Sequence, residues 1–192
     1  MIYETVITTM NPDGSVHIAP MGIRHEKEKY LIAPFKPSRT LDNLLHSGVA
    51  VINATADVLI IAGCLTGRHD WPVVQATHIA CKRLAGALSH VEVRVESSKD
   101  DELRPVFTCR AVHAAIHGPF RGFNRAQAAV VEAAILVSRL HMLPEQKIRS
   151  ELEYLDIAIG KTAGENERTA WQWLMEKVEQ YYAGNSNDAD KR

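Results

Sequence analysis

The run from Lys36 to Asn43 carries the residue types that bind a phosphate group. It reads Lys-Pro-Ser-Arg-Thr-Leu-Asp-Asn, so two cations and two hydroxyls come together at the start of a predicted helix. The first N–H groups of a helix lack intrahelical acceptors and lie at the positive end of the helix dipole, and an anion bound there satisfies both. The pattern predicts an anion site whose candidate ligands are Lys36, Ser38, Arg39 and Thr40.

Apolar spacing predicts the helix that presents this site. Leucines at positions 41, 44 and 45 are spaced for a short helix that is expected to end near Gly48. Either Ser38 or Thr40 can cap its first turn. A second interpretation fits the same run. In it, the hydroxyls only cap a surface helix and the cations are solvated. The neighbouring segments have to decide between the two.

The strand before this run ends in Ala19, Pro20, Met21 and Gly22. Proline removes a donor from a strand ladder, and glycine leaves the backbone open to close approach. The strand end is therefore a candidate platform for a flat ligand, although an ordinary edge strand with a bulge has the same sequence features.

The strand after the run contains Asn53, and Thr55 follows it. In an extended segment these two side chains project to one side. They are candidates for hydrogen bonds to a ring or a polyol chain, or they cap the turn before Asp57.

The composition limits the classes of partner. The chain has 192 residues with 46% hydrophobic content, enough to bury the core of one domain or of one domain with an appendage. Its 22 basic and 23 acidic side chains give a formal net charge of -1, so there is no global electrostatic case for binding nucleic acid or an anionic membrane. Any anion site must be local.

The cysteines and the amino terminus indicate a cytoplasmic protein. Cys64, Cys81 and Cys109 are an odd number without close spacing, which is typical of reduced thiols rather than of a disulfide framework. The residues after Met1 include an early acidic residue, and they do not show the basic region followed by an apolar region that is typical of a signal peptide. No apolar run approaches the ~20 residues that a membrane span needs.

The first part of the chain is predicted to be a β domain. The turn signal Asn11–Gly14 separates two strands of a hairpin, and more strands follow. The region 66–87 resists assignment. The expected strands cover residues 2–10, 15–23, 30–35, 49–53, 58–62, 91–95 and 106–117.

The chain changes character at Phe123. Asn124 and Gln127 form a capping-box-like start, and apolar residues at helical spacing predict three helices. Strands followed by helices indicate the α+β class rather than a doubly wound sheet. The predicted parts are a β domain over residues 1–122, a helical segment over 123–183 and a small, polar, disordered tail over 184–192.

In combination these segments resemble the flavin-reductase-like split β-barrels. That resemblance rests, in order along the chain, on Glu4–Thr9 with Asn11–Gly14, Ala19–Gly22, Lys36–Thr40 with Asn43, and Val51–Asn53. Further on, three segments resemble the uncharacterised family called domain of unknown function 447. They are Gly118–Ala126, Val137–Leu140, and Asp156–Gly164 with Trp171. The match covers nearly the whole chain up to the tail.

The resemblance implies an antiparallel split β-barrel of Greek-key type with about six strands, followed by a helical carboxyl-terminal segment. It also implies FMN as the cofactor and a homodimer with the flavin near the subunit interface. Ser38 and Thr40, with Lys36 or Arg39, would hold the phosphate, and Asn43 belongs to the same motif. Which of the two cations meets the phosphate stays open.

The implied chemistry is that of the flavin. Ala19–Gly22 would line the isoalloxazine edge, and Asn53 and Thr55 would lie near the ribityl chain or the ring. The flavin would carry hydride or electrons, so no protein nucleophile is needed, and none is readable around Gly63–Gly67. We expect an FMN-dependent oxidoreductase of undetermined substrate. The alternatives are a non-catalytic flavin carrier or interaction protein, and a β domain whose flavin site has decayed.

The histidines near the end of the β domain are not expected to bind a metal. Cys109, His113 and His117 are four residues apart and would share one face of a helix or of a strand. Along an extended strand such neighbours lie ~13 Å apart, too far for one ion.

Overall fold

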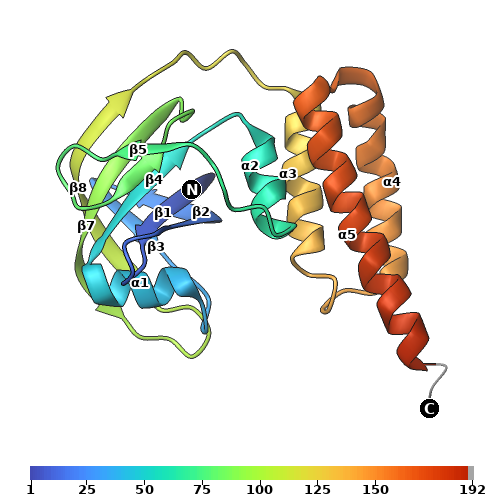
Figure 1. The fold of residues 1–192 in the computed structure, drawn as a ribbon, viewed down its shortest axis with the longest axis horizontal. Coiled ribbons are helices and arrows are strands. Elements are labelled where there is room, and N and C mark those ends of the chain that lie inside the picture. The colour runs from blue at the N-terminus through green and yellow to red at the C-terminus, as the bar shows by residue number, and fades with distance from the viewer. Residues whose placement is uncertain (190–192) are drawn as a thin grey trace. The chain divides into compact units, whose positions relative to one another are not determined.

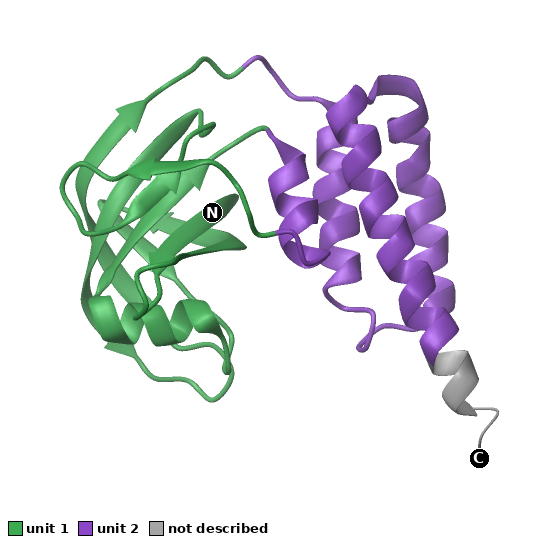
Figure 2. Cartoon of the chain, viewed as in Figure 1, with its two compact units in different colours: residues 1–56, 69–120 green, residues 57–68, 121–192 purple. Residues whose placement is uncertain are grey.

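The computed structural model describes residues 1–189, which form two compact units (Figure 2). The barrel unit comprises residues 1–56 and 69–120, and the helical unit comprises residues 57–68 and the chain from Arg121 onward. The sequence predicts a single change of character after residue 122. The observed division differs from this prediction in one segment. Residues 57–68 are expected in the β domain, but they belong to the helical unit.

Six antiparallel strands close a barrel in the order β1-β2-β3-β8-β7-β4 (Figure 1). The strands are β1 (Ile2–Met10), β2 (Val16–Glu26), β3 (Lys29–Ile32), β4 (Val49–Ala54), β7 (Ser89–Lys99) and β8 (Val106–Ile116). The predicted α+β class and the predicted six-stranded barrel are therefore confirmed. The predicted turn joins β1 to β2, where the Asn11 N–H donates to Ser15 O at 2.9 Å.

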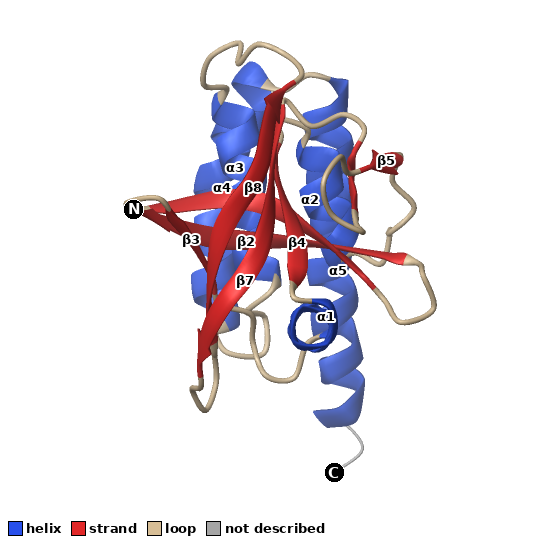
Figure 3. Ribbon diagram, turned by 90° about the vertical axis from the view of Figure 1, so that its left-hand side faces the viewer, coloured by secondary structure: helices blue, strands red, loops and turns tan. Residues whose placement is uncertain are grey.

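Alternate side chains of these strands fill the barrel. Val93 and Phe107, for example, are at most 2% exposed and belong to one apolar cluster. The helix α1 (Arg39–Ser47) adds Leu41 and Leu44 to this cluster at one end of the barrel (Figure 3). Packing therefore fixes the position of α1 against the strands.

The region left unassigned by sequence contains a small hairpin. It consists of β5 (Val73–Gln75) and β6 (Lys82–Leu84). The loop that joins the two strands places Ile79 and Cys81 against Val49 and Val51. These valines alternate with β4 side chains that point into the barrel, so the hairpin loop covers the outer face of β4.

Within residues 1–189, the helical unit contains four helices, which Figure 1 labels. They are α2 (Val58–Leu65), α3 (Arg125–Val137), α4 (Glu145–Thr162) and α5 (Glu165–Ala189). Asn124 caps α3 as predicted, because its side-chain oxygen accepts hydrogen bonds from the N–H groups of Ala126 at 2.8 Å and Gln127 at 3.2 Å. Within residues 1–189, no helix combines the length and the apolar character needed to cross a membrane.

The segment 58–62 is predicted to be a strand, and that prediction is wrong. The Asp57 carboxylate accepts a hydrogen bond from Leu59 N at 3.1 Å and starts α2. The helix contacts α3 and α5, and five of its eight residues are buried. A short run that is apolar on all sides lacks the periodicity that separates a buried helix from a strand.

The carboxyl-terminal helix is longer than predicted. Helix α5 continues to Ala189, whereas the sequence predicts a disordered tail from Gly184. Residues 190–192 of that predicted tail lie outside the described residues.

The strand β8 does not place Cys109 and His113 on one face. The pairing with β7 shifts register between Glu92 and Val93, so that one extra residue of β8 is inserted. Cys109 points into the barrel core, whereas His113 lies opposite Glu92, which alternates with the core residue Val93. In a regular strand, a separation of four residues would put Cys109 and His113 on one face. The bulge puts them on opposite faces of β8 instead.

Candidate functional site

The amino-terminal end of α1 has the geometry of an anion site. Ser38 is the N-cap, and its hydroxyl oxygen accepts a hydrogen bond from Leu41 N at 3.3 Å. The N–H groups of Arg39 and Thr40 precede the first carbonyl bond of the helix, which runs from Asp42 N to Ser38 O. The helix ends at Gly48 with a φ of 64°, as the sequence predicts. Two backbone donors are thus available at a fixed helix end.

The structure separates the two candidate cations. The Lys36 ammonium donates to Asp100 at 2.5 Å, and its own backbone N–H donates to Leu103 O at 2.8 Å. Arg39 is exposed in the first turn of α1, and none of residues 1–189 forms a hydrogen bond or ion pair with its guanidinium. Arg39 is therefore the cation that remains available to an anion at this helix end.

His17 also lies at this site, although the sequence patterns do not predict it. Its Nε2 lies 3.1 Å from the hydroxyl of Thr40, which is 2% exposed. Burial, and then the positive charges of Arg39 and His69, lower the pKa of His17. His17 lies two residues before Ala19 on β2, and this spacing on one strand face is the signal that could have identified it.

The Ala19–Gly22 segment lies within β2 and pairs with β1. Its side chains alternate between the two faces, so a ligand that meets all four residues would meet their backbone edge. The ladder between β2 and β3 covers only Arg24 to Glu26 on the β2 side, so this segment is paired on its β1 edge alone within the described chain. An open edge suits Pro20, which has no N–H to donate.

The position of Gly22 is crowded by side chains of the neighbouring strand. A Cβ atom there would lie 2.9 Å from Ile2 Cγ2 and 3.2 Å from a carboxylate oxygen of Glu4. The absence of a side chain at Gly22 therefore leaves room for these two side chains of β1.

The two asparagines of the predicted site are buried and bonded to protein. The Asn43 side-chain N–H₂ donates to Thr9 Oγ1 and to Asn11 Oδ1, both at 2.9 Å. Asn53 is 0% exposed, and its oxygen accepts from Leu84 N at 2.9 Å. Both residues support the surrounding strands. Thr55 is half-buried just beyond the end of β4.

Two family models together match most of the chain. Residues 3–118 match the amino-terminal domain of a protein of unknown function termed DUF447, and residues 124–176 match the second DUF447 model. No curated protein matches the chain.

Solved structures with the same fold include flavoproteins. An FMN-bound DUF447 protein from Methanosarcina mazei has a TM-score of 0.80 and 20% identity, over 92% of this chain and 94% of that one. The 2-nitrobenzoate 2-nitroreductase of Pseudomonas fluorescens has a TM-score of 0.53 and 17% identity, over 59% of this chain and 64% of that one. A flavoredoxin from Methanosarcina acetivorans has a TM-score of 0.52 and 12% identity, over 60% of this chain and 69% of that one.

Proposed function

Because this chain belongs to the DUF447 family, in which an FMN-bound member shares its fold, we propose that it is an FMN-binding flavoprotein. The observation that carries the proposal is the amino-terminal end of α1, where two backbone donors and the available Arg39 guanidinium lie together. That donor set fits a phosphate, because helix amino termini and guanidinium groups both favour oxyanions.

In this proposal the backbone N–H groups of Arg39 and Thr40 bind the phosphate, together with the Arg39 guanidinium. Ser38 shapes the helix end, and Thr40 is held by His17. The open edge of Ala19–Gly22 offers backbone groups to the rim of the isoalloxazine ring. Thr55 remains a candidate for the ribityl chain or the ring.

We further propose that the protein is an oxidoreductase. Bound flavin supplies transfer of hydride or electrons, and the protein has to bind it, orient it and stabilise its reduced form. Protein hydrogen-bond donors and positive charge close to the ring favour its reduced, anionic form. The structural similarity to a nitroreductase supports this reading at the level of the fold.

The absorption spectrum of the protein with FMN tests binding. We expect the flavin bands to shift and the flavin to remain with the protein through gel filtration. If neither the purified protein nor the protein incubated with FMN retains flavin, the proposed function is wrong. Anaerobic addition of NADH or NADPH then separates enzyme from carrier, because an oxidoreductase using these donors bleaches the bound flavin within seconds to minutes, and a carrier does not.

Arg39→Ala should weaken FMN binding by ~10-fold, because it removes a charged donor to the phosphate. Lys36→Ala is the matched control and should change FMN affinity by less than ~2-fold, because that ammonium is already bound to Asp100 in an exposed pair. Titration followed by flavin fluorescence measures both. A larger loss for Lys36→Ala than for Arg39→Ala would assign the phosphate to the other cation.

We also propose a homodimer formed through the barrel unit. Ile2, Tyr3 and Ile116 are 62%, 49% and 85% exposed, and all three belong to that unit. Exposed apolar side chains mark a subunit interface where they form one contiguous patch, and we propose that these side chains do so. Sedimentation equilibrium should give twice the mass of one chain, and a monomer at micromolar concentration would contradict the proposal.

A cytoplasmic location is proposed on the state of two cysteines. Cys81 and Cys109 are buried free thiols, and burial raises their pKa to about 11 and about 12 respectively. Reduced, unreactive thiols are typical of a reducing compartment. Cell fractionation with an antibody to this chain tests the location, and recovery outside the cytoplasmic fraction would reject it.

A further inference from the structure

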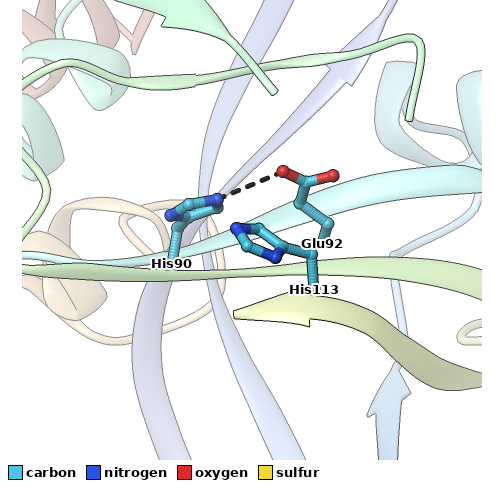
Figure 4. A group of neighbouring side chains, drawn as sticks. All are labelled: His90, Glu92 and His113. Atoms are coloured by element: carbon cyan, nitrogen blue, oxygen red, sulfur yellow. Dashed lines mark hydrogen bonds and ion pairs between the residues drawn. The ribbon is translucent and has the colours of Figure 1, made fainter. Parts of the chain in front are cut away.

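Three potential metal ligands meet on the barrel unit. His90 and Glu92 lie on β7, and His113 lies on β8 (Figure 4). One ligand atom from each of the three side chains lies within 4.8 Å of the others. The residue spacing along a single strand predicts no metal site, whereas these three side chains come from two strands.

The strand register explains how they meet. Glu92 and His113 are directly opposite each other, and His90 is two residues from Glu92 on the same face. This face is the outer one, because Val91 and Val93 pack toward the barrel core. The bulge next to Glu92 is what turns His113 to the outer face.

Glu92 is held in place by the loop between β5 and β6. Its side chain is 0% exposed, and its two oxygens accept hydrogen bonds from Thr77 N at 2.5 Å and His78 N at 2.7 Å. Two backbone donors orient the carboxylate and favour its charged form. A fixed, buried anionic ligand is thus present before any ion binds.

His90 is oriented in the manner of a metal ligand. Its Nε2 lies 3.3 Å from Glu92 Oε1, and its Nδ1 lies 2.8 Å from His117 Nε2. Histidines that bind metals usually engage their second ring nitrogen with another group, which sets the tautomer and the ring orientation. His117 supplies that group here.

His113 differs from the other two candidate ligands in its hydrogen bonding. It is half-buried, and within residues 1–189 its ring nitrogens form no hydrogen bond. Its ring centroid lies 4.7 Å from that of His78 and 5.6 Å from that of His90, so it faces the other imidazoles. A ring beside a buried carboxylate with no partner for its nitrogens is well explained as a ligand.

We propose that His90, Glu92 and His113 bind one divalent transition-metal ion of the zinc class. Two imidazoles and one carboxylate are a ligand set that zinc accepts, and three protein ligands leave the fourth position open. Ligand atoms around a tetrahedral zinc lie ~3.4 Å apart, as bonds of ~2.0–2.1 Å require. His90 Nε2 and Glu92 Oε1 already lie 3.3 Å apart, and the ligand atoms of all three residues lie within 4.8 Å of one another, so His113 is the ligand that has to move closer.

Metal titration of the chelator-treated full chain tests the proposal. We expect calorimetry to show one Zn²⁺ per chain, and Co²⁺ to give the intense visible bands of four-coordination. His113→Ala should weaken Zn²⁺ binding by more than ~100-fold, and His117→Ala by ~10-fold as an outer partner. His141→Ala is the matched control, since this exposed histidine belongs to the helical unit, and it should bind Zn²⁺ as the wild type does.

Far-ultraviolet circular dichroism and the midpoint of thermal unfolding serve as the check that each variant is folded, and neither depends on the proposed flavin site. The proposal is overturned if the wild type takes up no stoichiometric ion, or if folded His113→Ala retains wild-type affinity. An effect of His141→Ala as large as that of His113→Ala would also overturn it, because the ion would then bind elsewhere.

Discussion

Ser38→Asp is expected to lower the affinity for FMN by ~100-fold and to change the affinity for riboflavin by less than ~3-fold. Aspartate caps a helix as well as serine does, so the hydrogen bond to Leu41 N and the position of α1 are retained. The new carboxylate, however, lies where the phosphate of FMN would bind. Two like charges ~4 Å apart near a protein surface repel by up to ~4 kcal/mol, which is enough for the expected loss.

Ser38→Asn is the matched control for this experiment. Asparagine has the size of aspartate and also caps helices, but it carries no charge. We expect it to lose less than ~10-fold in FMN affinity, so that the difference between the two variants measures charge alone. Equal losses for FMN and riboflavin in Ser38→Asp would place the phosphate elsewhere on the protein.

Asn53→Ala is expected to destabilise the barrel unit by ~3 kcal/mol. The Asn53 amide donates to Val6 O at 3.0 Å, and its oxygen accepts from Leu84 N at 2.9 Å, so one buried side chain joins β1, β4 and β6. Alanine would leave both backbone groups without this partner and would open a cavity. If Asn53 instead contacts the cofactor, as the family resemblance implies, its removal should weaken flavin binding.

Hydrogen exchange followed by mass spectrometry distinguishes these expectations. Peptides from β1, β4 and β6 should exchange up to ~100-fold faster in Asn53→Ala, as a loss of ~3 kcal/mol requires, while peptides from α3 and α5 should be unchanged. Asn166→Ala, the same change at an exposed position of α5, is the control and should alter neither set. Unchanged exchange in β1 together with weakened flavin binding would restore Asn53 to the cofactor site.

Local signals were sufficient for much of the fold. The hairpin turn after Asn11, the helix between Ser38 and Gly48 and the cap at Asn124 are each set by neighbouring residues, and all three are present. The prediction failed where tertiary contacts decide. Helix α2 is apolar on all sides because it is buried among other helices, and the loop that carries Ile79 is ordered by its packing on β4.

In the candidate site too, features set by neighbouring residues could be predicted, and features that depend on distant residues could not. The helix end and its cap could be predicted, because both follow from Ser38 and the leucine spacing. The pairing of Lys36 could not be predicted, since its partner Asp100 is 64 residues away in the chain. The outward position of His113 was equally hidden, because it depends on a bulge in the pairing of two strands.

The membership of residues 57–68 in the helical unit has a consequence for the order of folding. These residues lie between β4 and β5 in the chain, so the helical unit is completed by a segment that is synthesised before the last two barrel strands, β7 and β8. On a ribosome, α2 would emerge before α3 and α5 are synthesised, so the apolar side chains that pack on those helices would stay exposed to water until then. The two units are therefore not encoded by two separate, continuous segments of the gene. A truncated gene that ends at Phe120 would encode every barrel strand, yet it would also encode an apolar helix deprived of its packing partners.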